Sequence, residues 1–268
     1  MTAGARRIAG RLYGDYLLPS RLREYELLLS LALSAGYETL PLGEFVTLEA
    51  LPDRVLLLRH DIDSEITTAK RMWQIEERLG VRGTWFFRLS TWDDALIAAI
   101  AAGGSEIGYH YEELATLALR HGARSREAAL ELVAEARDLL RVNTADVRRR
   151  SGLPLTSFAS HGDFTNRQTG VANTVLLDDP ALRRELDVRV EAYDESVTAR
   201  FDARSSDREY PQLWVPADPV DALRAGAAVI EILVHTRPWG AARVSNARLD
   251  LARLRDGALL LARSRRRR

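Results

Sequence analysis

Four of the five histidines in this sequence stand at or next to the C-terminal end of a predicted strand. They are His60, His110, His161 and His235. In α/β barrels the loops that follow the strands converge at this edge and carry the active site. A single histidine in such a place is more often structural, but four that share one edge with carboxylates favour a functional site.

Two carboxylates lie in the segment His60-Asp61-Ile62-Asp63, directly after an apolar run. In an extended chain Asp61 and Asp63 point to the same side, and His60 points to the other. Two neighbouring carboxylates resist ionising together unless a cation lies between them. A divalent metal would leave one of them as a ligand and the other as a base for the attacking water. The structural alternative is that Asp63, beside Ser64, caps the helix that follows.

The surroundings of the other histidines favour different roles. His110 is a candidate metal ligand, because neutral imidazole is the commonest nitrogen donor to metals. Glu112, on the same face of the strand, is a candidate ligand or the partner of a ligand. His161 precedes Gly162, which allows a sharp turn or a close backbone approach. His235 has no metal-type spacing nearby, so we expect it to be a general acid.

The elements that must position these residues alternate between strand and helix. Strands are predicted at 55–58, 82–89, 106–111, 155–161, 186–193 and 229–235, and helices at 22–33, 65–79, 93–102, 125–142 and 249–261. Such alternation indicates a parallel sheet with helical crossovers. About six or seven strands over roughly 200 residues predict a closed or nearly closed (β/α) barrel, with an open doubly wound sheet as the alternative.

Length and composition limit the class of protein. The chain has 268 residues, of which 46% are hydrophobic and 28% charged, as is typical of a globular domain. No apolar run approaches the roughly 18–20 residues of a membrane span. The first residues lack the apolar core of a secretory signal, and the chain contains no cysteine. We therefore expect a cytoplasmic protein with neither membrane span nor disulfides.

The charge distribution argues against a nucleic-acid partner. Basic and acidic residues both number 38, and five of the arginines lie in the tail at 263–268, so residues 1–262 carry 33 − 38 = −5. A mildly acidic body is a poor surface for nucleic acid. The basic tail is expected to be a disordered, solvated terminus.

At the residues singled out above, the sequence resembles the polysaccharide deacetylase superfamily of NodB-like carbohydrate esterases, in a divergent branch with an HDxD motif. The resemblance is carried, in order, by RHDID at 59–63, GTWFF at 83–87, SEIGYHYE at 105–112, SFASHG at 157–162 and EILVHTRPW at 231–239. It implies an α/β fold with a distorted (β/α)7-type barrel over residues 49–262. A helical lead-in at 1–48 would precede this single domain.

The resemblance also implies roles for individual residues. In that superfamily a pair of aspartates after the first strand supplies a catalytic base and a metal ligand, which implies Asp61 as base and Asp63 as ligand, or the reverse. The histidine after Glu-Ile-Gly-x is a metal ligand, here His110. The histidine at the end of a late strand is the general acid, here His235.

This chain departs from the family pattern at one metal position. The second metal histidine of the superfamily stands four residues after the first, where this sequence has Leu114. We expect His161 or Glu112 to replace it. A mixed set of histidine and carboxylate ligands favours zinc as the divalent metal, with cobalt, nickel and manganese as alternatives.

The function implied is that of a metal-dependent hydrolase that removes an acyl group from an N-acylated sugar or polysaccharide precursor by breaking an amide C–N bond. Its partner would be a carbohydrate substrate, and the oligomeric state is left open. Two alternatives remain at this point. One is a non-catalytic relative that binds a glycan or a protein partner, and the other is a metal phosphoesterase.

Overall fold

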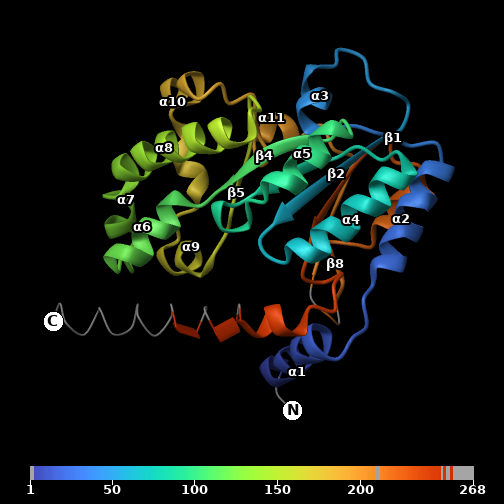
Figure 1. Ribbon diagram of the computed structural model, residues 1–268, viewed down its shortest axis with the longest axis horizontal. Coiled ribbons are helices and arrows are strands. Elements are labelled where there is room, and N and C mark those ends of the chain that lie inside the picture. Colours follow the sequence, from blue (N-terminus) through green and yellow to red (C-terminus); the bar gives the residue numbers. More distant parts are fainter. Residues whose placement is uncertain (1–2, 209, 211, 249, 252–253, 256–268) are drawn as a thin grey trace.

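The computed structural model describes residues 3–208, 210, 212–248, 250–251 and 254–255 (Figure 1). The basic tail predicted at 263–268 lies outside these residues. So does most of the helix predicted at 249–261, although residues 243–248, 250–251 and 254–255 are helical. No helix in the described ranges is both long and apolar enough to cross a bilayer.

One mostly parallel sheet organises the described chain. Its strands are β1 (Glu38–Thr39), β2 (Val55–Ile62), β3 (Thr84–Phe87), β4 (Glu106–Tyr111), β5 (Ser157–Ser160), β6 (Val190–Glu191), β7 (Ala203–Asp207), β8 (Trp214–Val215) and β9 (Val229–His235). They follow the order β6-β5-β4-β3-β2-β9-β7-β8, with β1 beside β2. Among the strands of the described residues, only β7 and β8 pair antiparallel.

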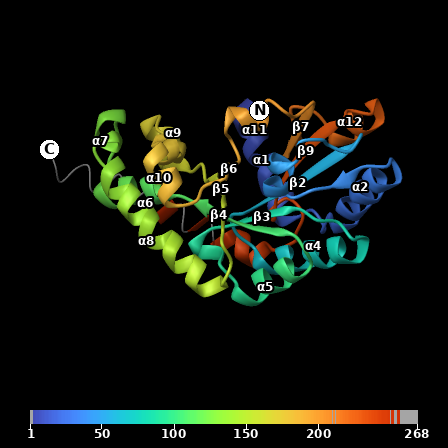
Figure 2. The ribbon, with the colours of Figure 1, turned by 90° about the horizontal axis from the view of Figure 1, so that it is seen from above.

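Helices connect these strands. They are α1 (Ala3–Tyr16), α2 (Leu22–Ser34), α3 (Leu42–Thr47), α4 (Ile66–Leu79), α5 (Asp94–Ala102), α6 (Glu113–His121), α7 (Arg126–Leu130), α8 (Val133–Ser151), α9 (Phe164–Thr169), α10 (Pro180–Glu185), α11 (Glu195–Thr198) and α12 (Pro219–Ala225). Figure 2 shows α8, α5, α4 and α2 along the outer side of a curved sheet.

The sheet curls into a half-barrel. Its two ends, at β6 and β8, do not pair with each other among the described residues. The parallel α/β architecture predicted from the alternation of strands and helices is therefore confirmed. The finer (β/α)7 designation remains a prediction, because β6 contributes only a two-residue ladder to β5.

Strand β2 is buried on both faces, and successive side chains point to opposite sides. Leu56, Leu58 and Ile62 belong to the core beneath the outer helices. Leu57 belongs to the separate core inside the curve of the sheet. The same alternation sends Arg59 and Asp61 to the inner side, where a site can form at the strand ends.

His60 therefore points to the outer side, away from the other three histidines that we grouped with it. Its ring stacks on Trp85 with 3.6 Å between centroids. Its Nε2 lies 3.0 Å from Oε1 of Glu76, to which the Tyr25 hydroxyl donates a hydrogen bond of 2.5 Å. All four side chains are fully buried. His60 thus belongs to the packing of α2 and α4 on the sheet.

Several element boundaries differ from those predicted. The helix predicted at 125–142 is two helices, α7 and α8, and the strand predicted at 186–193 shrinks to β6. Asp63 does not cap α4, because the residue at the cap is Glu65, in the left-handed region with φ of 56°, and no side chain caps this helix. The neighbouring Ser64 carbonyl accepts a hydrogen bond from the Thr236 hydroxyl, which ties the end of β9 to the end of β2.

The buried hydrogen bond from Tyr25 to Glu76 predicts a measurable stability difference. Removing the hydroxyl in Tyr25→Phe leaves the buried Glu76 carboxylate with one donor fewer. We expect the free energy of unfolding in urea to fall by about 1.5–3 kcal/mol. Tyr13→Phe, at a position 44% exposed, is the matched control and should change it by less than about 0.5 kcal/mol. Equal losses in the two variants would contradict the role given to Tyr25.

Candidate active site

Parallel pairing brings the C-terminal ends of four strands together. In the register of β2 with β9, Asp61 lies opposite His235. In the register of β4 with β5, His110 lies opposite Ala159, two residues before His161. Residues far apart in the sequence thereby share one edge of the sheet.

Asp63, His110 and His161 form a compact group of donor atoms. Oδ1 of Asp63 lies 3.2 Å from Nε2 of His110 and 3.0 Å from Nδ1 of His161. The two ring nitrogens are 3.3 Å apart. In the described part of the chain this is the group of three residues whose ligand atoms could hold a metal ion.

The geometry of this group fits a divalent cation. Bonds of about 2.0–2.2 Å from ligands to one ion separate neighbouring ligand atoms by about 3–3.5 Å. The three distances observed fall in that range. Oδ1 of Asp63 is also buried without a hydrogen-bond donor in the described structure, which is costly for a carboxylate oxygen unless a cation compensates it. Three protein ligands also match a catalytic site, which keeps a position open for substrate or water.

The ring of His110 is held in the orientation that a ligand needs. Its Nδ1 lies 2.8 Å from the Ala159 carbonyl oxygen, which can only accept, so Nδ1 carries the proton. In the neutral ring Nε2 then presents its lone pair to the donor group. Burial lowers the pKa of His110, but the carboxylates of Asp61 and Asp63 outweigh this effect and raise that pKa above 6.5. The same negative charge attracts a metal cation.

His161 is held in place by hydrogen bonds to both its backbone N–H and its backbone carbonyl. Its N–H donates to the Tyr111 carbonyl at 2.9 Å, which continues the ladder of β5 with β4 by one residue. Its carbonyl accepts from the Asn173 side chain at 2.6 Å. The imidazole therefore meets Asp63 and His110 at the end of the strand.

Glu112 lies outside the donor group. Both of its carboxylate oxygens accept from Arg88, at 3.0 Å and 2.5 Å. Arg88 also donates to the Asp63 carbonyl at 3.1 Å. Of the two residues that we expected to complete the metal group, the structure brings His161 into it and pairs Glu112 with a guanidinium instead. Glu112 thus supports the loop of Asp63 through Arg88.

Asp61 is held at the edge of the donor group by a buried arginine. Arg59 donates to its two carboxylate oxygens at 2.9 Å and 2.8 Å. Oδ2 of Asp61 lies 3.6 Å from Nε2 of His110. Burial raises the pKa of Asp61, but Arg59, with His110 and His235, outweighs this and holds it below 3.8. Asp61 is therefore ionised and oriented, as a proton acceptor must be.

His235 forms a pair with Asp207 that the sequence did not predict. Its Nδ1 lies 2.7 Å from Oδ1 of Asp207, and its backbone N–H donates to Oδ2 at 2.8 Å. The Trp239 indole N–H also donates to Oδ2, at 2.8 Å. Burial lowers the pKa of His235, but Asp207 chiefly, with Asp63 and Asp61, raises it to about 9. His235 is thus protonated at neutral pH.

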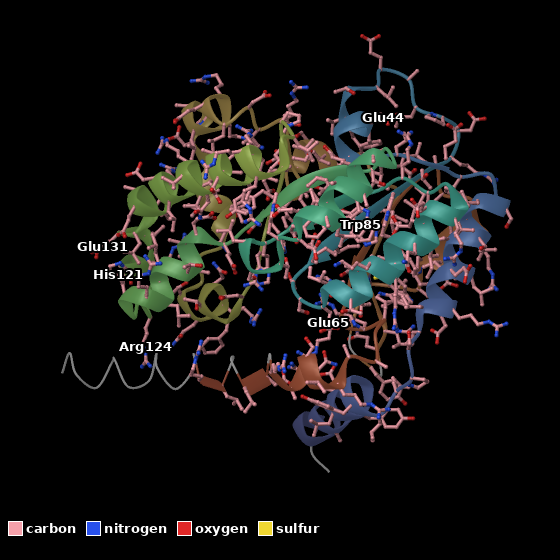
Figure 3. The ribbon with its side chains drawn as sticks, in the orientation of Figure 1. Glu44, Glu65, Trp85, His121, Arg124 and Glu131 are labelled. Carbon is pink, nitrogen blue, oxygen red and sulfur yellow. The ribbon has the colours of Figure 1, made fainter. Side chains whose placement is uncertain are left out.

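One cavity of about 380 Å³ opens over this arrangement. Asp61, Asp63, His110, His161 and His235 all line it. The fifth histidine, His121, lies elsewhere: it is the last residue of α6, at the outer end of that helix (Figure 3). The cavity therefore combines a possible metal group, an ionised carboxylate and a protonated imidazole.

No protein-family model and no curated protein sequence matches this chain. The likeness to the polysaccharide deacetylases accordingly rests on the sequence segments quoted above.

The donor group predicts which residues control metal affinity. Substituting His161→Ala removes a ligand atom, and we expect zinc affinity measured by isothermal titration calorimetry to fall at least about tenfold. Glu112→Gln is the matched comparison, since Glu112 contacts Arg88 and none of the three donor atoms. It weakens one support of the Asp63 loop, so it should lower zinc affinity less than His161→Ala does. If Glu112→Gln loses zinc while His161→Ala keeps it, the ligand assignment is wrong.

Proposed function

We propose that this protein is a metal-dependent hydrolase that removes an acyl group from an N-acylated sugar. The observation that carries the proposal is that the donor group of Asp63, His110 and His161 shares one cavity with Asp61, held by Arg59, and His235, held by Asp207. Amide hydrolysis needs a proton acceptor for water and a proton donor for the leaving nitrogen. Asp61 and His235 are in opposite protonation states at neutral pH, as that reaction requires.

The metal, when held by Asp63, His110 and His161, supplies Lewis-acid polarisation of the acyl carbonyl and lowers the pKa of water. Zinc suits this ligand set of two imidazoles and one carboxylate. The ligand positions belong to two strand ends and the loop after β2, so the backbone of the sheet fixes their separation.

Asp61 accepts the proton of the attacking water. Its carboxylate is ionised because Arg59 stabilises the charged form, and the bidentate contact leaves its orientation little freedom. Both side chains are almost completely buried, so solvent competes little for this contact. The water oxygen then forms the new bond to the acyl carbon.

His235 donates a proton to the amide nitrogen as the C–N bond breaks. Without this proton the nitrogen would leave as an R–NH⁻ anion, which is a very poor leaving group. The turnover rate therefore depends on this proton transfer. Asp207 stabilises the imidazolium and fixes which ring nitrogen faces the cavity, because Nδ1 is engaged with its carboxylate. The products are a carboxylic acid and a free amine, and the proton held by Asp61 can return to the solvent or to His235.

The class of substrate comes from the resemblance and from the cavity. A volume of about 380 Å³ is within the range of about 300–1,000 Å³ that small-molecule sites occupy.

The alternative of a non-catalytic relative is favoured by the absence of a histidine at position 114, where this chain has Leu114. With His161 in the donor group, that argument no longer favours it.

The direct test is release of acetate from N-acetylated chitooligosaccharides by the purified protein. We expect turnover that a chelator abolishes and that added zinc restores. Turnover unaffected by chelation would contradict the metal-dependent mechanism. A protein that binds zinc in the donor group but hydrolyses no N-acyl sugar would contradict the proposed reaction.

The pair of His235 and Asp207 predicts a specific pH dependence. Because the imidazolium must be present, the rate constant kcat/KM should fall as pH rises through about 9, the pKa of His235. In Asp207→Asn the main stabiliser of the imidazolium is lost, so this alkaline limb should move to lower pH, towards 6.5. His235→Asn should lower turnover about 10²–10⁴-fold with zinc binding nearly unchanged.

His121→Asn is the control for the substitution at His235, since His121 lies at the far end of α6, outside the cavity. It should leave both the rate and the pH profile unchanged. An alkaline limb at the same pH in Asp207→Asn and wild type would refute the assignment of His235 as the acid.

A further inference from the structure

One wall of the cavity carries a row of polar side chains from a single strand. Arg204, Ser206 and Arg208 alternate along β7 and the residue after it, and all three line the cavity. The intervening residues Ser205 and Asp207 are nearly fully buried. The row lies beside β9, which ends in His235. It therefore faces the space next to the proposed proton donor.

The charges around the cavity are not all compensated within the protein. The acidic side chains lining it are Asp61 and Asp63, of which Asp61 is paired with Arg59 and Asp63 belongs to the metal group. Arg204 is ion-paired with the fully buried Glu231. Arg208 is exposed, and within the described chain its guanidinium has no ion pair.

The excess charge at this wall is therefore positive, and a bound divalent cation would add to it. A guanidinium beside a hydroxyl is suited to an oxyanion, because it offers charge and several parallel N–H donors. Ser206 supplies such a hydroxyl on the same row, two residues before Arg208. A neutral sugar would leave the Arg208 charge without a counterion in the cavity.

We propose that the substrate carries an anionic group, a phosphate or a carboxylate, that binds Arg208 and Ser206 on the β7 wall while the N-acyl group faces the Asp63, His110 and His161 group. This inference rests on the proposed function for the identity of the N-acyl group. It adds the chemical class of the sugar: an acidic amino sugar and not a neutral one.

Binding can be tested without turnover by using amino sugars that have no acyl group to lose. We expect the zinc-loaded protein to bind glucosamine 1-phosphate and muramic acid, or one of the two, at least about tenfold more tightly than glucosamine in calorimetry. The tighter of the two acids identifies phosphate or carboxylate as the anion. The preference should weaken as salt rises from about 0.05 M to 0.5 M, because the contact is partly exposed.

The variant Arg208→Gln should lower the affinity for the acidic sugar about tenfold, while Arg224→Gln leaves it unchanged. Arg224 is an exposed arginine on α12 outside the cavity, so it controls for a general loss of positive charge. The same comparison applies to turnover of the N-acetylated forms, where the ratio of kcat/KM for acidic over neutral sugar should fall in Arg208→Gln.

Equal affinity for acidic and neutral amino sugars would overturn the inference. So would equal effects of Arg208→Gln and Arg224→Gln. If the acidic sugars bind through Arg208 but none of the N-acetylated forms is hydrolysed, the anion site stands and the proposed reaction fails. The two failures are therefore distinguishable.

Discussion

The burial of both faces of β2 is the constraint on which the rest of the site depends. Because side chains alternate along a strand, one stretch of sequence delivers His60 to the helix layer and Arg59 and Asp61 to the inner side. A shift of register by one residue would exchange the two sets and bring His60 to the cavity. Packing of Leu56, Leu58 and Ile62 under the helices prevents that exchange. The hydrophobic core thus decides which polar residues meet at the strand ends.

Burial also explains why the polar residues come in pairs. Arg59 and Asp61 are almost inaccessible to solvent, and a charge so placed is destabilising unless a partner compensates it. Asp207 is likewise buried and is satisfied by His235 and Trp239. Buried ion pairs contribute little net stability compared with apolar packing. Their value here is the fixed orientation and protonation state of Asp61 and His235.

The sequence predicted the order of the main strands well, but their ends and their partners across the sheet less well. The strand predicted at 55–58, for example, continues to Ile62 in β2. The six-residue span of β4 was predicted correctly, because its apolar and aromatic residues are flanked by glycines and a helix start. The sequence left open whether His161 or Glu112 joins Asp63 in the metal group. No spacing rule connects residues 98 positions apart (161 − 63), so it could not choose between them. Glu112 was predicted as a possible ligand because it lies on the same face of the strand as His110. Its pairing with Arg88, which follows another strand, cannot be read from the local sequence.

Asp207 shows most clearly why part of the site escaped prediction. Strand β7 has the sequence Ala-Arg-Ser-Ser-Asp, which has no apolar alternation and so gives no strand signal. Its place in the sheet comes from parallel pairing with β9, a tertiary interaction. The face occupied by His60 could have been inferred, because the alternation of His60 and Asp61 was recognised. The extent of the sheet's closure, in contrast, depends on the short ladder of β6, which composition does not reveal.

The central claim is that Asp63, His110 and His161 form a metal centre. A crystal structure of the zinc-loaded protein, with anomalous scattering recorded on both sides of the zinc absorption edge, tests it directly. We predict a single strong peak about 2.0–2.2 Å from Oδ1 of Asp63, Nε2 of His110 and Nδ1 of His161. A peak bound elsewhere, or none at these three atoms in crystals soaked at saturating zinc, would contradict the account.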